Sequence, residues 1–163
     1  MSASPNHKDW YRTLDLLEKM HAACITGSLV SFSTAIAACE NGQQWENALS
    51  LLREMQYAGV EPDLICFSAA ISSCEKGGQW ERALSLLEKV REAGVMPNVV
   101  TFTAAMLACQ KSGQWECVLP LLDEMHKMDV TLNSLSCNAA MTALSLAGEL
   151  EQGLQLLSTI VQE

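Results

Sequence analysis

The sequence predicts an all-α solenoid of antiparallel helix-turn-helix repeats, and three observations indicate it. Residues 64–98 are identical to residues 29–63 at 20 of 35 positions, and residues 99–133 follow the same pattern. The tryptophans are spaced 35 residues apart, at Trp10, Trp45, Trp80 and Trp115. Each unit also contains two stretches with apolar residues at helical spacing, separated by glycine. Self-similarity at such a period is typical of solenoids, in which each unit buries apolar surface against its neighbours.

The period also predicts how the chain is divided. We expect a single array over residues 1–163, with full units at 29–63, 64–98 and 99–133, a partial unit at 1–28 and a truncated unit at 134–163. Solenoids usually end in capping units with a polar outer face. The apolar residues of the last predicted helix have no following unit to cover them; they are Leu154, Leu157 and Ile160. We therefore expect either a longer protein or an end that self-associates.

The first helix of each unit is predicted from apolar residues at its fourth, eighth and eleventh places. At about 100° per residue these places fall within one arc, as in a helix packed on one face. They are Phe32, Ile36 and Cys39, then Phe67, Ile71 and Cys74, then Phe102, Met106 and Cys109, and finally Cys137, Met141 and Leu144. The chain has seven cysteines and no CxxC pair, so we expect core thiols rather than disulfides or a metal site.

The second helix of each unit is predicted to begin near its tryptophan, because apolar residues recur from there at i+3, i+4 and i+7. This spacing favours tryptophans that pack in the core over tryptophans that stack on a ligand. The glycines between the helices fit the left-handed residue that ends a helix, or the turn after it; they are Gly42, Gly77, Gly78, Gly113 and Gly148. Pro120 falls inside a predicted second helix, where we expect a kink.

Small polar residues recur on the opposite side of each first helix. The fifth places hold Ser33, Ser68, Thr103 and Asn138, and the full units close with Asp63, Asn98 and Asn133. One interpretation is that these residues only cap helices. The second places beside them are aliphatic, however, and hold Val30, Ile65, Val100 and Leu135. An aliphatic flank beside a small polar residue suits a flat aromatic ligand such as a base.

The sequence resembles pentatricopeptide repeat proteins of the plain 35-residue type. The resemblance rests on the period, the turn glycine, the Ala-Leu-x-Leu-Leu core of the second helix, Ala-Gly-Val, and Pro-Asp or Pro-Asn at unit ends. It implies a right-handed superhelix that binds single-stranded RNA with one nucleotide per unit, in which the fifth and last residues read a base. It also implies that the second-place aliphatic residues sandwich the bases and that a thirteenth-place lysine meets phosphate.

Transferred to this chain, the resemblance makes Ser33 with Asp63 similar to a guanine reader. Ser68 with Asn98, and Thr103 with Asn133, are similar to adenine readers, so the implied register is 5′-G-A-A-3′. Asn138 occupies the fifth place of the truncated unit. The lysines at the phosphate place are Lys76 and Lys111, whereas Asn41 and Leu146 depart from the pattern.

Composition limits the other functions. The formal net charge of -9 and the pI near 4.7 argue against a generally basic, sequence-blind nucleic-acid binder. No apolar run approaches the roughly 20 residues of a membrane helix, and His7, His21 and His126 have no metal spacing. We therefore expect no catalytic residues, no metal, no cofactor and no membrane partner. The resemblance suggests an organellar RNA-processing or stabilising factor in the chloroplast or mitochondrion. The alternative is a helical-repeat scaffold that uses its acidic surface to bind other proteins.

Overall fold

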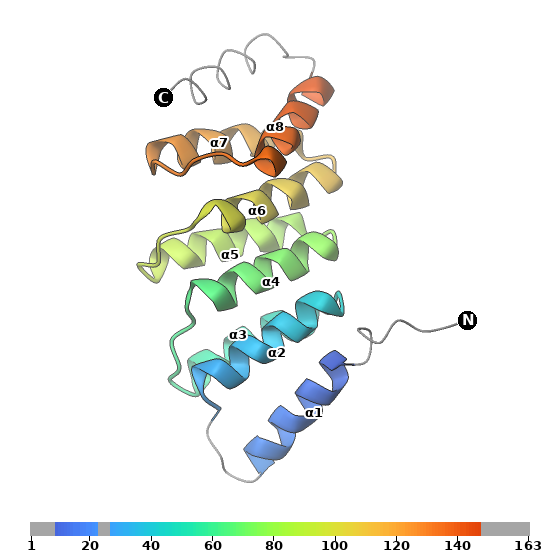
Figure 1. Cartoon of the computed structure of the whole chain (residues 1–163), viewed down its shortest axis with the longest axis vertical. Coiled ribbons are helices and arrows are strands. Elements are labelled where there is room, and N and C mark those ends of the chain that lie inside the picture. Colours follow the sequence, from blue (N-terminus) through green and yellow to red (C-terminus); the bar gives the residue numbers. More distant parts are fainter. Residues whose placement is uncertain (1–8, 23–26, 148–163) are drawn as a thin grey trace, which may run out of the picture.

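The computed structural model describes residues 9–22 and 27–147, which form the stacked helix pairs of Figure 1. The helices are α1 (Asp9–Ala22), α2 (Leu29–Asn41), α3 (Trp45–Tyr57), α4 (Leu64–Lys76), α5 (Trp80–Glu92), α6 (Val99–Lys111), the 3-10 helix η2 (Trp115–Cys117), α7 (Val118–Lys127) and α8 (Ser134–Ala147). Within these ranges there is no β-strand, and the predicted all-α solenoid of antiparallel helix pairs is confirmed. The expectations for Gly148, Leu154, Leu157 and Ile160 lie outside the described residues.

The helices form two layers. The first helices α2, α4, α6 and α8 contact one another in sequence, and each of α2, α4 and α6 also contacts the second helix of its own unit. The second helices α3 and α5 lie behind this layer in Figure 1. One face of the array is therefore made of first helices and the other of second helices, so a ligand on one face does not touch the other.

Two stripes are buried on α4 and α6, and the sequence predicted one of them. The predicted arc is confirmed for the first three units, since Phe32, Ile71 and Cys109 and their equivalents are almost fully buried. The second stripe lies at the third, seventh and tenth places and holds small residues; in α6 it is Thr101, Ala105 and Ala108. Small side chains let neighbouring first helices pack closely. In α8 the residues of this stripe, Ser136, Ala140 and Ala143, are buried, whereas the prediction that Met141 is a core residue is wrong, because that side chain is 48% exposed.

The turn after α4 has two adjacent glycines, which serve two different purposes. Gly77 has an ordinary helical backbone, but a Cβ atom there would overlap with Cδ1 of Trp45 from the preceding unit. Gly42 has the same relation to Trp10, at 2.5 Å. The left-handed residue comes one place later and has φ of 66° at Gly78 and 57° at Gln43. The tryptophans are half-buried, and each of these two packs on the backbone of the next unit.

Pro120 affects its helix differently from the kink that we expected. The second helices of the two preceding units begin as α-helix at the tryptophan, whereas here a 3-10 turn, η2, comes first and α7 begins at Val118. Pro120 is therefore the third residue of α7. In the first turn of a helix the backbone N–H has no intrahelical partner, so proline is tolerated there. The break falls upstream of the proline.

The buried thiols predict how stability depends on pH. Burial raises the pKa of Cys39 and Cys74 to about 11, and that of Cys66 and Cys109 to about 12, from an ordinary value of 9.0. Because the folded state favours the neutral thiol, this stabilisation is fully present below about pH 9 and is lost as the pH rises through 11 to 12. We expect the melting temperature to fall over this window. Cys74→Ala should be less stable at pH 7 but lose less stability between pH 8 and 11, and a wild-type curve that stays level to pH 11 would contradict the prediction.

Candidate functional site

A groove of about 320 Å³ lies on the first-helix face, between α2, α4 and the start of α6. Its lining includes Ile65 and Val100, the second-place residues of two successive units. It also includes Ser68 and Asn98, the fifth and last residues of the unit between them. The structure thus brings together, in one hollow, four residues that lie up to 35 positions apart in the sequence. We call this hollow the first-helix groove.

The second-place aliphatic residues form an exposed row along this face. Their side chains are 72%, 66%, 55% and 50% exposed at Val30, Ile65, Val100 and Leu135. Each is the second residue of its first helix, so it lies on the turn that follows the helix cap. The row repeats once per unit, in register with the groove. Four exposed aliphatic side chains at one repeated place suit flat ligands that pack between successive units.

A hydrogen-bond relay links the fifth and last residues of the central unit through Thr101. The Thr101 hydroxyl donates to Oδ1 of Asn98 at 3.0 Å, and the Thr101 backbone N–H donates to the same oxygen at 3.0 Å. The Ser68 and Thr101 hydroxyl oxygens are 2.9 Å apart. Because the Thr101 proton is directed to Asn98, Ser68 is the donor in that contact. The relay leaves the Asn98 amide as a donor and the Ser68 oxygen as an acceptor toward the groove.

The two neighbouring pairs are arranged differently. Ser33 donates to the carbonyl oxygen of Val30 at 3.1 Å, while Asp63 accepts from the N–H of Cys66 at 2.9 Å. Burial, and after it the nearby Asp63 carboxylate, raises the pKa of the Cys66 thiol to about 12. Residue 66 therefore occupies the place of Thr101 as a neutral thiol. Without a hydroxyl relay, Asp63 keeps acceptor capacity on its second carboxylate oxygen.

In the following unit Thr103 is only 4% exposed, and its hydroxyl donates to the carbonyl oxygen of Val99 at 2.6 Å. Asn133 accepts from the N–H of Ser136 at 2.7 Å and is exposed. Asn138 is exposed on α8. The structure therefore presents Ser68, Asn98, Asn133 and Asn138 on the surface more fully than Thr103.

The alternative interpretation of these residues as helix caps is confirmed for the last place of each unit. Asp63 and Asn98 are the N-caps of α4 and α6, and the Asn133 side chain accepts from an N–H in the first turn of α8. The fifth-place residues do not cap, because Ser33 and Thr103 donate to carbonyl oxygens within their own helices. Capping therefore accounts for one of the two predicted reading places and not for the other.

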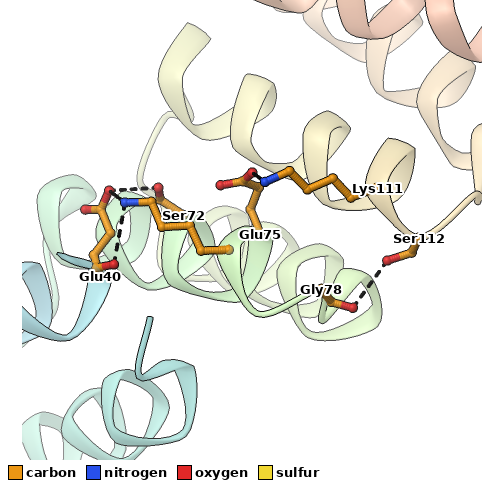
Figure 2. A network of polar contacts seen from close by, with 7 residues as sticks. Glu40, Ser72, Glu75, Gly78, Lys111 and Ser112 are labelled. Carbon is orange, nitrogen blue, oxygen red and sulfur yellow. Dashed lines mark hydrogen bonds and ion pairs between the residues drawn. The ribbon is translucent and has the colours of Figure 1, made fainter. Parts of the chain in front are cut away.

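The lysines at the phosphate place are both held by glutamates of the preceding unit (Figure 2). Nζ of Lys76 lies 3.0 Å from Oε1 of Glu40, which also accepts from the Ser72 hydroxyl at 2.9 Å. Lys111 forms the same ion pair with Glu75, whose side chain is only 10% exposed. In each pair the glutamate is the twelfth residue of one unit and the lysine the thirteenth of the next. We call these two pairs the glutamate–lysine ladder.

The ladder sets the electrostatics of the first-helix face. Each lysine charge is neutralised by a carboxylate from the neighbouring helix. The first-helix face therefore lacks the net positive charge that would attract a phosphate backbone. Sequence reasoning identified the two lysines and did not predict their partners. The signal was present in the recurrence of Glu at the twelfth place and Lys at the thirteenth, at Glu40, Lys76, Glu75 and Lys111. The role of Thr101 had no comparable signal.

Among residues 9–22 and 27–147, no helix is long and apolar enough to cross a bilayer. The same residues contain no group of three or more His, Cys, Asp or Glu side chains placed to hold a metal ion.

An α-solenoid of stacked helical hairpins defines the class of helical-repeat proteins. The chain belongs to the pentatricopeptide repeat family. The pattern of the pentatricopeptide repeat domain matches residues 50–112, and that of the single PPR repeat matches residues 30–60 and 100–130. A comparison of the sequence with curated proteins finds no significant match.

Solved structures share the fold. The PPR domain of Arabidopsis thaliana protein-only RNase P 1, in complex with tRNA, has a TM-score of 0.81 at 14% identity, and the match covers 95% of this chain and 83% of that one. The pentatricopeptide repeat protein PPR10 from maize has a TM-score of 0.67 at 25% identity, with 95% and 22% covered. PPR10 in complex with an 18-nucleotide psaJ RNA element matches at 23% identity, with a TM-score of 0.67 and 94% and 26% covered. This chain thus spans about a quarter of the maize protein's chain.

Proposed function

We propose that this chain binds single-stranded RNA without catalysing a reaction, with one nucleotide per unit in the first-helix groove. The observation that carries the proposal is the placement of Ile65 and Val100 on either side of Ser68 and Asn98. A base that enters there would pack its two faces on aliphatic side chains and turn its edge toward the polar pair. Single-stranded RNA is recognised in this manner, through unstacked bases that are sandwiched and read along their edges.

The hydrogen-bond relay fixes which donor and which acceptor the central unit presents to a base. The Asn98 amide is a donor and the Ser68 oxygen an acceptor, since both are oriented by Thr101. Adenine offers the complement, with an acceptor at N1 and a donor at its N6 amino group. Adenine is also the base that the family resemblance assigns to this pair. Asp63, a carboxylate, offers only acceptors, which suits the N1–H and N2 amino donors of guanine.

The full proposal assigns three readers, with Ser33 and Asp63 for guanine and with Ser68 and Asn98, then Thr103 and Asn133, for adenine. Thr103 must exchange its bond to Val99 for a base contact. Asn138 is proposed as the fifth-place reader of the next unit, Val30, Ile65, Val100 and Leu135 as the sandwiching residues, and Lys76 and Lys111 as the phosphate contacts. The solved complexes of PPR10 with an RNA element and of the RNase P 1 PPR domain with tRNA support RNA as the ligand.

We further propose that this binding serves RNA processing or stabilisation in an organelle, which rests on the family resemblance.

RNA binding can be tested with a fluorescein-labelled RNA that carries GAA in a uridine background, compared with the same RNA carrying CCC. We expect the GAA RNA to bind more tightly at low salt. Asn98→Asp should shift the preference at the middle base from adenine to guanine by about tenfold, because a donor becomes an acceptor at that edge. Fluorescence anisotropy measures both effects.

The matched control is Asn47→Asp, which makes the same charge change on the second-helix α3. It should lower the affinity for every RNA alike and leave the base preference unchanged. Equal binding of GAA and CCC, together with an Asn98→Asp variant that has no effect on preference, would refute base reading by this chain. Binding of basic proteins without any RNA binding would favour the scaffold alternative instead.

A further inference from the structure

We propose that a groove on the opposite face of the solenoid docks an acidic segment of a partner protein. This groove of about 310 Å³ runs between the second helices α3 and α5, and we call it the second-helix groove. Arg53 of α3 and Arg82 and Lys89 of α5 line it, above a floor that includes Leu52, Leu86 and Phe67. The occupant is a peptide that places carboxylates on these three cations and an apolar side chain on the floor.

Most cations without an ion-pair partner among the described residues lie in the second-helix groove. Among residues 9–22 and 27–147, five basic side chains form ion pairs; they are Lys19, Lys76, Arg91, Lys111 and Lys127. The other four have no ion-pair partner and are Arg12, Arg53, Arg82 and Lys89. Three of those four line the second-helix groove, and its one acidic lining residue is Glu81. In a chain of formal charge -9, this groove therefore gathers most of the cations that have no ion-pair partner among the described residues.

The cations of the second-helix groove are oriented by their surroundings and by their helix spacing. The guanidinium of Arg82 lies over the ring of Trp45, 5.3 Å from its centroid, so a cation–π contact orients it. Arg82 and Lys89 are seven residues apart on α5 and therefore share one helix face, which looks across the groove to Arg53 on α3. Arginine presents a planar fork that matches a carboxylate through two parallel hydrogen bonds. Two arginines and a lysine around one hollow suit two or three carboxylates.

The floor of the second-helix groove favours a peptide over RNA. The floor side chains Leu52, Leu86 and Phe67 are nearly buried, which gives a closed apolar base instead of the exposed aliphatic pairs that flank the first-helix groove. A phosphate backbone gains nothing from such a floor, whereas an aliphatic side chain of a peptide does. The groove also lies between second helices, away from the residues proposed to read bases. The two sites can therefore be occupied independently.

The experiment uses a fluorescein-labelled ten-residue peptide that alternates aspartate with leucine, titrated with the full chain. We expect saturable binding by fluorescence anisotropy that weakens with salt. The Arg53→Gln/Arg82→Gln double variant should bind at least tenfold more weakly. Arg12→Gln, which removes the one unpaired cation of residues 9–22 and 27–147 that lies outside the groove, should bind like the wild type. A peptide with serine in place of leucine should lose affinity, which tests the apolar floor.

Three results would overturn the proposal. One is a double variant that binds the acidic peptide as the wild type does. Another is a decauridine RNA that competes with the acidic peptide and whose binding is weakened by the same substitutions, since the groove would then accept any polyanion. Lys89→Gln keeps the contact between Arg82 and Trp45, so it tests the groove if circular dichroism shows that the double variant is unfolded. The third result is a Lys89→Gln variant whose affinity for the acidic peptide is unchanged. The preference for the GAA RNA over the CCC RNA should be unchanged by all these substitutions.

Discussion

Gly77→Ala should lower the free energy of unfolding by about 2 kcal/mol. The added Cβ atom would overlap with Cδ1 of Trp45, an aromatic ring packed against the core that cannot rotate away freely. Overpacking of this kind costs about 1–3 kcal/mol, and the lost flexibility of the unfolded chain returns about 0.4–1 kcal/mol. The steric term is the larger of the two at this overlap. Urea denaturation followed by far-UV circular dichroism measures the difference.

A double-mutant cycle with Trp45→Leu identifies the cause. Leucine lacks the ring atom that the new methyl group meets, so Gly77→Ala should cost at least 1 kcal/mol less in the Trp45→Leu background. Ser112→Ala is the matched control, because Ser112 occupies the same place of the next unit and already has a Cβ atom. It loses only the hydrogen bond to the carbonyl oxygen of Gly78, at 3.2 Å. Equal losses from Gly77→Ala in both backgrounds would rule out the contact with Trp45 as their cause.

The Glu40→Gln/Glu75→Gln double variant should bind the GAA RNA about tenfold more tightly at low salt. Both substitutions break the glutamate–lysine ladder and release Lys76 and Lys111 toward phosphate. Each phosphate neutralised on a single strand steepens the salt dependence by about 0.7 in log K against log salt, so two new contacts should add about 1.4. Anisotropy titrations at four salt concentrations measure the affinity and the slope together.

The matched control removes two other acids and leaves the ladder intact. Glu46 and Glu81 lie in the first turns of α3 and α5, on the other layer, and both are exposed. Glu46→Gln/Glu81→Gln makes the same change in net charge without releasing a lysine. If both double variants raise the affinity equally and leave the slope alone, net charge rather than the ladder governs binding.

Much of the fold could be predicted from the sequence because the recurrence of one pattern shows where each unit begins. The period of 35 residues and the arc of Phe67, Ile71 and Cys74 were sufficient for the helix pairs and the main core. Pro120 was harder, since its position alone does not tell whether a helix bends or starts later. The exposure of Met141 depends on how far α8 turns its small residues toward α6, which periodicity cannot specify.

The sequence predicted which residues lie along the first-helix face, and it did not predict the contacts that join them. The exposure of Ile65 and its pairing with Val100 around one groove followed from the repeat. The relay through Thr101 and the bond between Lys111 and Glu75 join residues of different units, and their partners depend on the distance between stacked helices. A single unit, viewed alone, holds no information about that distance.

The helix caps at Asp63, Asn98 and Asn133 have a consequence for redesign of this protein. A side chain at these positions must accept a hydrogen bond from the next helix, and replacing a good cap with alanine costs about 0.5–2 kcal/mol. The choice there is effectively limited to aspartate, asparagine, serine and threonine, because the helix needs a cap whatever the ligand is. The residues at the fifth places do not cap a helix and are free of this restriction. Engineering of new preferences should therefore vary Ser33, Ser68 and Asn138 widely and the closing residues only within that set.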